Sequence, residues 1–168
     1  MVKKVLDQKP QFMNLSAVES AANTYTEIAT STPVVPAISA GKSIVMEILK
    51  IFIYTTPMPQ VANQLSTLDV WVLKKKVGSV PLPSDSNIVT YGSRSIACGA
   101  AIGPVVYWNE PIELDLTDGQ GNGYLFGNKE IIVAVDTNNV VAVFTAYVKI
   151  LYRLVEVSSN ELLGILQE

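Results

Sequence analysis

The side chains that most often carry out chemistry in proteins are scarce in this sequence. It contains no histidine, the residue that most often serves as a general base or a metal ligand. The single cysteine, Cys98, lies among small and apolar residues, so we expect a buried, inert thiol. Serines, lysines and carboxylates are present, but no spacing singles out a catalytic set. We therefore predict a protein that is not an enzyme.

One Gly-rich stretch, residues 115–123, carries oxygen ligands at spacings that could hold a calcium ion. The candidates are Asp115, Asp118 and Asn122. The stretch lacks the closing bidentate glutamate of an EF-hand, and Tyr124 stands where a dinucleotide-binding fingerprint needs its last glycine. We favour a tight turn between two strands, in which glycine supplies positive φ angles, with calcium as the alternative.

Two groups of lysines are candidates for contact with nucleic acid. Lys3, Lys4 and Lys9 lie near the N-terminus and would touch phosphate weakly if many copies lined an enclosure. Lys74–Lys76 follow Trp71, and basic residues beside an aromatic could hold a single strand, although a solvated strand end is the more common role. The net charge of −3 and a total of two arginines argue against a folded surface built to grip nucleic acid.

Composition predicts one domain that hides surface against other molecules. The chain has 168 residues, of which 49% are apolar and 16% charged, whereas an average soluble domain has about 25% charged residues. Such a charge-poor chain is expected to bury surface against copies of itself, and the alternative is a well-packed monomer with an exterior rich in Thr, Ser and Asn. One cysteine excludes an internal disulfide, no segment predicts a transmembrane helix, and the N-terminus lacks the apolar core of a secretion signal.

β-Strand signals dominate the chain. Residues 129–157 predict one long hairpin, because two β-branched runs flank the turn-forming residues 136–139. Alternation over residues 24–30, ended by two prolines, indicates an edge strand. Further short strands are expected at residues 68–75, 87–91, 96–98, 105–108 and 112–116.

A second strong strand is predicted at residues 43–55. Both of its alternating sets of side chains are mostly apolar, which indicates burial on both faces. Because a strand in a two-layer sandwich normally buries one face, we expect the other face to meet another subunit or the N-terminal arm. Helix is the competing interpretation, but the density of β-branched residues and the prolines that follow favour a strand.

The two ends of the chain differ from its middle. Residues 1–20 show no firm period and are interpreted as an arm that is ordered where it meets a neighbour. Residues 158–168 predict a helix, because Ser158 and Glu161 have the spacing of a capping box before an apolar stripe. A helix this short must dock, either under its own sandwich or onto a neighbouring subunit.

These signals together predict the fold class. We expect an all-β, antiparallel, two-sheet jelly-roll sandwich of about eight strands over residues 21–157, followed by the short C-terminal helix. No internal repeat of 20–50 residues is present.

Over residues 20–168 the chain resembles the single jelly-roll capsid proteins of small icosahedral viruses. The pattern that carries the resemblance is a first strand near residues 21–25, a core strand at 43–49, a last long strand at 149–157 and a terminal helix at 161–166. The resemblance implies that the sandwich forms a shell wall in the virion and that terminal arms cross to neighbouring subunits. The Arg-rich arm that neutralises RNA in many such proteins is missing, so this chain is expected to contact packaged nucleic acid weakly.

The function that we predict is a structural shell protein without a required cofactor. Its expected partners are copies of itself, with other capsid proteins as a further candidate. Its expected subunit contacts are apolar residues of the strand at 43–55 and of the terminal helix: Ile44, Met46, Ile48, Leu162, Leu163, Ile165 and Leu166. The alternative is a jelly-roll module that binds carbohydrate or another ligand. An enzyme on the same scaffold, such as a cupin, fits poorly because cupin metal sites rely on histidine.

Overall fold

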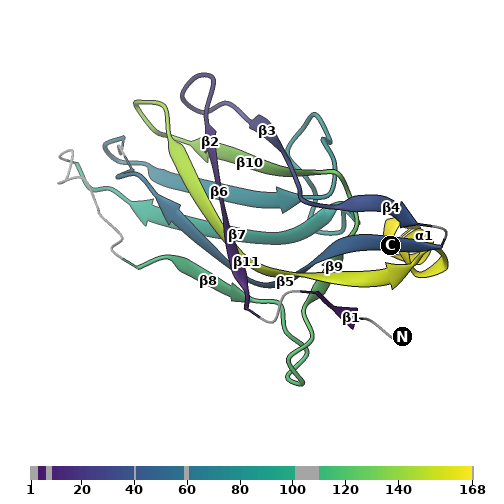
Figure 1. The fold of residues 1–168 in the computed structure, drawn as a ribbon. Helices are drawn as coiled ribbons and strands as arrows, with labels where there is room; N and C mark the ends of the chain where they lie inside the picture. Colours follow the sequence, from purple (N-terminus) through teal and green to yellow (C-terminus); the bar gives the residue numbers. More distant parts are fainter. Residues whose placement is uncertain (1–3, 7–8, 40, 59–60, 101–109, 168) are drawn as a thin grey trace.

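A computed structural model describes residues 4–6, 9–39, 41–58, 61–100 and 110–167, which form two antiparallel β-sheets and one helix (Figure 1). Sheet A contains β1 (Lys4–Val5), β2 (Gln11–Val18), β4 (Val35–Ser39), β5 (Lys42–Thr55), β8 (Ile112–Asp115), β9 (Tyr124–Phe126) and β11 (Thr145–Ser158). Sheet B contains β3 (Thr26–Ser31), β6 (Leu65–Leu73), β7 (Ile88–Ala97) and β10 (Glu130–Asn138). The helix α1 spans Ser159–Gln167.

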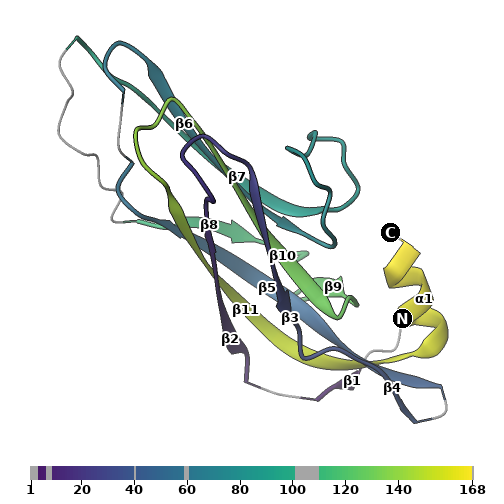
Figure 2. The ribbon, with the colours of Figure 1, turned by 90° about the horizontal axis from the view of Figure 1, so that it is seen from above.

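The order of the strands is that of a jelly roll. In sheet A, β11 pairs with β5 along one edge and with β1 and β2 along the other, while β5 also pairs with β4, β8 and β9. Sheet B has the order β3-β10-β6-β7. Connections such as β2 to β3, β5 to β6 and β10 to β11 cross between the sheets, which form the two layers visible in Figure 2. The predicted all-β, antiparallel, two-sheet jelly roll with a C-terminal helix is confirmed.

The main core lies between the two sheets. Alternate residues of each strand point inward, so Val70 of β6, Val133 of β10 and Val148 of β11 have almost no exposed surface. The outward residues of β6 and β10 are also buried, because Trp71, Leu73, Ile132 and Ala134 form a second cluster on the outside of sheet B. These two strands are therefore apolar on both faces.

The predicted hairpin at residues 129–157 is wrong, because its two strands belong to different sheets. β10 pairs with β3 and β6, whereas β11 pairs with β1, β2 and β5. Between them, the backbone N–H and C=O of Val140 bond to the Asn23 side chain, at 2.9 and 3.0 Å. The backbone N–H of Phe144 donates to buried Glu19, and the Phe144 ring fills the core. These contacts lead the chain across the sandwich instead of folding it back.

The proposed arm is also wrong over residues 11–18, which form β2. This strand pairs with β11 from Thr145 to Tyr152 and buries Leu15 and Ala17. The predicted first strand near residues 21–25 is instead part of the turn that leads from β2 to β3. The predicted edge strand is confirmed, because β3 has β10 as its single partner within the described sheet.

The inner face of β5 and the first half of its outer face are covered within this chain. A bulge leaves Leu49 without a partner in β11. Met46 and Ile48 point into the core before the bulge, and Ile51 and Ile53 do so after it, because one extra residue reverses the alternation. Both alternating sets therefore look apolar in the sequence although a single face lines the main core. The strand itself is confirmed. Its outer face is buried within this chain at Val45 and Glu47, whereas Tyr54 at the other end is 41% exposed and open to another subunit.

The helix α1 begins with the predicted capping box. The Ser158 backbone N–H donates to the Glu161 carboxylate at 2.8 Å, and the Glu161 N–H donates to the Ser158 hydroxyl at 3.2 Å. Leu162 and Ile165 pack in one cluster with Val45, Val155 and Val157. The helix therefore docks under its own sandwich. It lies at the end of the molecule where β1 and β4 also lie (Figures 1 and 2).

Of the remaining predicted strands, residues 68–75 correspond to β6 and residues 112–116 to β8. Residues 87–91 and 96–98 form one continuous strand, β7. The strand predicted at residues 105–108 lies outside the described residues.

Candidate interaction surfaces

No cluster of metal-binding side chains emerges in the described part of the chain. Across those residues, no group of three or more histidine, cysteine, aspartate or glutamate side chains is placed to hold a metal ion. Cys98 is half-buried just after β7, so the expectation of a buried thiol is wrong. Within the same residues, no helix has the length and apolar character to cross a membrane.

The residues predicted to form subunit contacts divide into buried and exposed groups. Met46 and Ile48 are fully buried between the sheets, which corrects the expectation that they face another subunit. Leu162 and Ile165 are buried on the side of α1 that packs against the sandwich, and Ile44 is half-buried on β5. Leu163 and Leu166 are 57% and 49% exposed on the outer side of α1. Of the seven predicted contacts, these last two leucines offer the most surface to a partner.

The outer face of sheet A carries an aromatic patch that the sequence interpretation missed. We define this aromatic face by Phe12, Tyr54, Tyr147 and Lys149. Tyr147 of β11 lies directly opposite Tyr54 of β5, and both rings are exposed. Phe12 on β2 is 52% exposed, and the Lys149 ammonium lies 4.2 Å from the centre of its ring. The face therefore combines exposed aromatic rings with a cation.

The outer face of sheet B combines aromatic rings with acidic groups. The Trp71 ring stacks on exposed Tyr91 at 5.8 Å and meets Tyr25 edge-on at 6.0 Å. Trp71 and Tyr91 line a 270 Å³ pocket together with Asp69, Ile88, Pro81 and Pro83. Asp69 lies directly opposite Asp136 on the neighbouring strand. Residues 25, 69, 71, 91 and 136 are called the acidic-aromatic face below.

The acidic groups of this face perturb one another. Burial, followed by the nearby charges of Glu19 and Asp69, raises the pKa of Asp136 above its ordinary value. Burial also raises the pKa of the Tyr25 hydroxyl, which donates a 2.7 Å hydrogen bond to Glu27. Because like charges directly opposite on paired strands repel, this face is a favourable place for a cation from a partner.

The calcium candidates form a hydrogen-bonded turn. Asp118 accepts bonds from the backbone N–H groups of Gln120 and Asn122 and from the Asn122 amide, and these bonds lower the pKa of Asp118. Asp115 accepts bonds from the hydroxyl and N–H of Thr117, which lower the pKa of Asp115, and lies 3.6 Å from the Lys50 ammonium. Their carboxylates already have donors, which agrees with the favoured tight turn. Calcium binding there remains a prediction.

A buried ion pair anchors this Gly-rich turn to the sandwich. Glu47 of β5 has no exposed surface and accepts a hydrogen bond from the Arg153 guanidinium. Its other carboxylate oxygen accepts the backbone N–H of Gly123 at 2.9 Å, and Arg153 donates to the Gly121 carbonyl at 3.1 Å. The two charges thus tie residues 121–123 to β5 and β11.

The N-terminal lysines lie near acidic surface. Lys4 pairs in register with Glu156, whose pKa is lowered chiefly by its hydrogen bond with Lys42 and also by the charge of Lys4. Lys9 is exposed before β2, and Lys3 lies outside the described residues. The weak nucleic-acid contact predicted for these three lysines remains a prediction.

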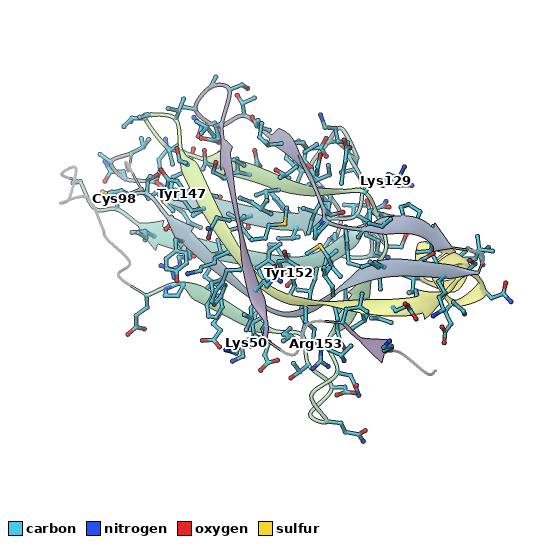
Figure 3. All side chains as sticks on the ribbon, viewed as in Figure 1. Lys50, Cys98, Lys129, Tyr147, Tyr152 and Arg153 are labelled. Carbon is cyan, nitrogen blue, oxygen red and sulfur yellow. The ribbon has the colours of Figure 1, made fainter. Side chains whose placement is uncertain are left out.

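The second lysine group includes one lysine more than the sequence indicated. Lys74–Lys76 leave the end of β6 and line a groove with Lys129, while Trp71 lies on the acidic-aromatic face and does not line that groove. In Figure 3, Lys129 and Cys98 lie toward opposite ends of the sandwich. Sequence spacing could not join Lys129 to this group, because the chain winds through three strands between them.

Comparison with known proteins shows similarity at the level of the fold. No protein-family model matches the chain, and no curated protein matches it. Among solved structures, VP1 of Trichodysplasia spinulosa-associated polyomavirus, in complex with GM1 oligosaccharide, has a TM-score of 0.60 at 10% identity, covering 94% of this chain and 99% of that chain. New Jersey polyomavirus VP1 has a TM-score of 0.59 at 9% identity, covering 89% and 99%.

An unassembled pentamer of Merkel cell polyomavirus VP1 is also similar, with a TM-score of 0.57 at 8% identity over 91% of this chain and 98% of that chain. These polyomavirus VP1 proteins are jelly-roll capsid proteins. The resemblance to the capsid proteins of small icosahedral viruses is therefore confirmed for the fold.

Proposed function

We propose that this chain is a structural shell protein of a virion, that it assembles with copies of itself, and that it has no catalytic step. The observation that carries this proposal is a jelly roll that matches VP1 capsid proteins along 94% of the chain. The aromatic face supports it, because exposed aromatic side chains are enriched where proteins meet. One similar VP1 structure is a pentamer, which supports assembly through self-contacts.

Two surfaces of the chain have complementary character. The aromatic face of sheet A presents Lys149 among exposed rings, and the acidic-aromatic face of sheet B presents Asp69 and Asp136 beside Tyr91. These faces lie on opposite layers of one sandwich, so the first face of one copy can meet the second face of the next. A contact between different faces generates a ring when the rotation closes. Assembly would then pair Lys149 with the two aspartates.

Charge reversal tests this contact. Lys149→Glu and Asp69→Lys should each weaken assembly, because like charges would meet across the interface. The double variant K149E/D69K restores opposite charges and should recover assembly. Lys76→Glu makes the same change in charge away from both faces and serves as the matched control. Light scattering and electron microscopy of the purified chain provide the readout.

The outcomes separate shell formation from the particular contact. A strictly monomeric native chain across salt and pH would overturn the shell function. Assembly that is unaffected by both single reversals would overturn this pairing of faces. Recovery in the double variant would support both, provided that thermal unfolding shows each variant to be folded.

A ligand-binding module is the second candidate function. The pocket on the acidic-aromatic face supports it, because Trp71 and Tyr91 provide ring surfaces beside the Asp69 carboxylate. Aromatic surfaces with a few polar groups are typical of small-ligand sites. If this module binds carbohydrate, a glycan array should show binding that Tyr91→Ala abolishes. An array without any binding would count against this function and leave the shell protein as the sole proposal.

A further inference from the structure

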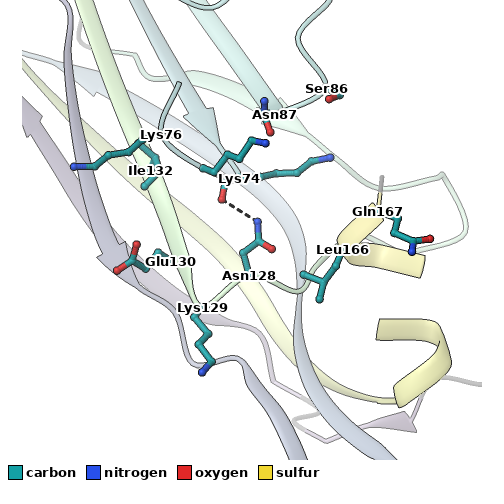
Figure 4. Close-up of a pocket in the computed structure, with 11 residues that line it drawn as sticks. Lys74, Lys76, Ser86, Asn87, Asn128, Lys129, Glu130, Ile132, Leu166 and Gln167 are labelled. Atoms are coloured by element: carbon teal, nitrogen blue, oxygen red, sulfur yellow. Dashed lines mark hydrogen bonds between the residues drawn. The ribbon is translucent and has the colours of Figure 1, made fainter. Parts of the chain in front are cut away.

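A groove beside α1 gathers four lysines from two distant parts of the chain. Lys74, Lys75 and Lys76 follow β6, and Lys129 lies in the short connection between β9 and β10. The groove has a volume of about 830 Å³ (Figure 4). Glu130 is the single acidic side chain among its described lining residues. A chain of net charge −3 thus places four of its 12 basic residues around one groove.

Within the part of the chain that the structure describes, these four positive charges have no ion-pair partner. Among the described residues, no salt bridge involves any lysine of the groove. By contrast, Lys42 pairs with Glu156 at 2.7 Å, and Lys50 pairs with Glu113 at 2.6 Å. The groove therefore has a positive local field that an anionic ligand would neutralise.

Hydrogen bonds fix the walls of the groove. The backbone N–H of Lys74 donates to the Asn87 carbonyl, and the Asn128 amide donates to the Lys74 carbonyl, both at 2.8 Å. On the other wall, the Thr32 N–H donates to the Lys129 carbonyl at 2.8 Å, and the Thr32 hydroxyl donates to the Asn128 carbonyl at 2.6 Å. A ligand would therefore meet backbone that is already in place, which lowers the entropy lost on binding.

The arrangement of the side chains suits an extended anion. Figure 4 shows Lys76 and Lys129 extending toward different sides of the groove. Lys74 lies beside Asn87, and Asn128 lies between Lys74 and Lys129. Charges that are spread along a surface match a row of phosphates better than a single one. The described lining contains no aromatic ring, so base stacking plays no part in recognition there.

We propose that this groove binds the phosphates of an extended polyanion, either a single strand of nucleic acid or inorganic polyphosphate. Each lysine would donate charge-assisted hydrogen bonds to phosphate oxygens. The site is independent of the proposed contact between the two faces, because none of its lysines belongs to either face.

Two triple variants with the same loss of charge test the site. The groove variant carries Lys75→Gln, Lys76→Gln and Lys129→Gln. The matched control, K42Q/K50Q/R94Q, removes three charges from β5 and β7, away from the groove and from the N-terminal lysines. The probes are fluorescent single-stranded oligothymidine, followed by anisotropy, and inorganic tripolyphosphate, followed by calorimetry and by competition.

The groove variant should bind its probe on the order of tenfold more weakly than the native chain, while the control variant should bind nearly as well. For oligothymidine, loss of three phosphate contacts should lower the slope of log K against log salt by about 2, since each contact to a single strand contributes about 0.7. Binding of the oligonucleotide alone identifies a nucleic acid strand as the source of the phosphates. Binding of tripolyphosphate, with competition between the probes, identifies a site for free polyphosphate as well.

Equal weakening in the two triple variants would overturn the proposal, because it would mean diffuse attraction without a site. Absence of binding by either probe to the native chain would also overturn it. Circular dichroism checks the fold of each variant. If the groove triple does not fold, Lys129→Gln alone, at an exposed position, should still weaken binding measurably.

Discussion

Replacing Arg153 with methionine would remove the cation that faces a fully buried carboxylate. Glu47 has no exposed surface, and its two oxygens accept bonds from Arg153 and from the backbone of Gly123. Without the guanidinium, the charge of Glu47 would remain in the protein interior after losing the cation that faces it. The turn at residues 121–123 would also lose its bond from Arg153 to Gly121.

The structure gives a magnitude for this loss. Breaking a buried ion pair by removing one partner destabilises a protein by about 3–5 kcal/mol. The Arg153 side chain is 23% exposed, so the lower part of that range, about 3 kcal/mol, is expected. For a chain of this size each 1 kcal/mol shifts Tm by roughly 2–4 °C, so R153M should lower Tm by roughly 6–12 °C.

A double-mutant cycle separates the ion pair from packing. Urea unfolding of the native chain, R153M, Glu47→Leu and R153M/E47L at neutral pH gives the four free energies of unfolding. The double variant should be more stable than R153M, because it no longer buries a carboxylate that has lost its cation. R153M should also regain stability as the pH falls, since protonation neutralises the carboxylate left behind. A loss below about 1 kcal/mol in R153M would refute this account of the buried pair.

Three further outcomes are expected. The double variant L163D/L166D should change the free energy of unfolding by less than about 0.5 kcal/mol and weaken assembly, since both side chains are exposed. Leu162→Asp should instead destabilise the fold by more than about 2 kcal/mol, because the Leu162 side chain is buried. Light scattering measures assembly, and thermal unfolding measures stability. Asp136→Asn should be more stable than the native chain at pH 7, because the pKa of Asp136 is raised in the folded state. Relative to the variant, the native chain therefore loses stability as the pH rises from 3.8 through the raised pKa of Asp136; urea unfolding at several pH values measures the difference. If the turn at residues 115–122 binds calcium, added calcium should raise Tm in the native chain and not in Asp118→Ala, and no shift in the native chain would leave the turn as a purely structural element.

Local signals predicted those elements whose contacts are local. The helix at 159–167 followed from its capping box, and the strand at 42–55 followed from its β-branched residues. The apparent two-sided burial of that strand came from the bulge at Leu49, which shifts the inward set from even to odd positions. A bulge depends on the partner strand, so the sequence of β5 by itself does not reveal it.

Two features depend on contacts between residues that are distant in sequence: the placement of β10 and β11 in different sheets, and the formation of the lysine groove. The turn residues 136–139 are compatible with a hairpin, and the bonds of Asn23 and Glu19 to the next segment send the chain to the other sheet. In the same way, Lys129 joins Lys74–Lys76 only once β6 and β10 pair. The alternation of Met13, Leu15 and Ala17 was a usable signal for β2, but exposed Phe12 and Val18 obscured it.

The pairing of β1 has a consequence for the path of the chain. Its residues Lys4 and Val5 lie opposite Glu156 and Val155, a few positions before α1 begins. The first and last described elements are thus fastened to the same stretch of β11, and a short covalent link between them would span little distance. Circular permutation becomes practicable: new ends opened at the exposed glycines 119 and 121 would leave every strand of both layers uncut.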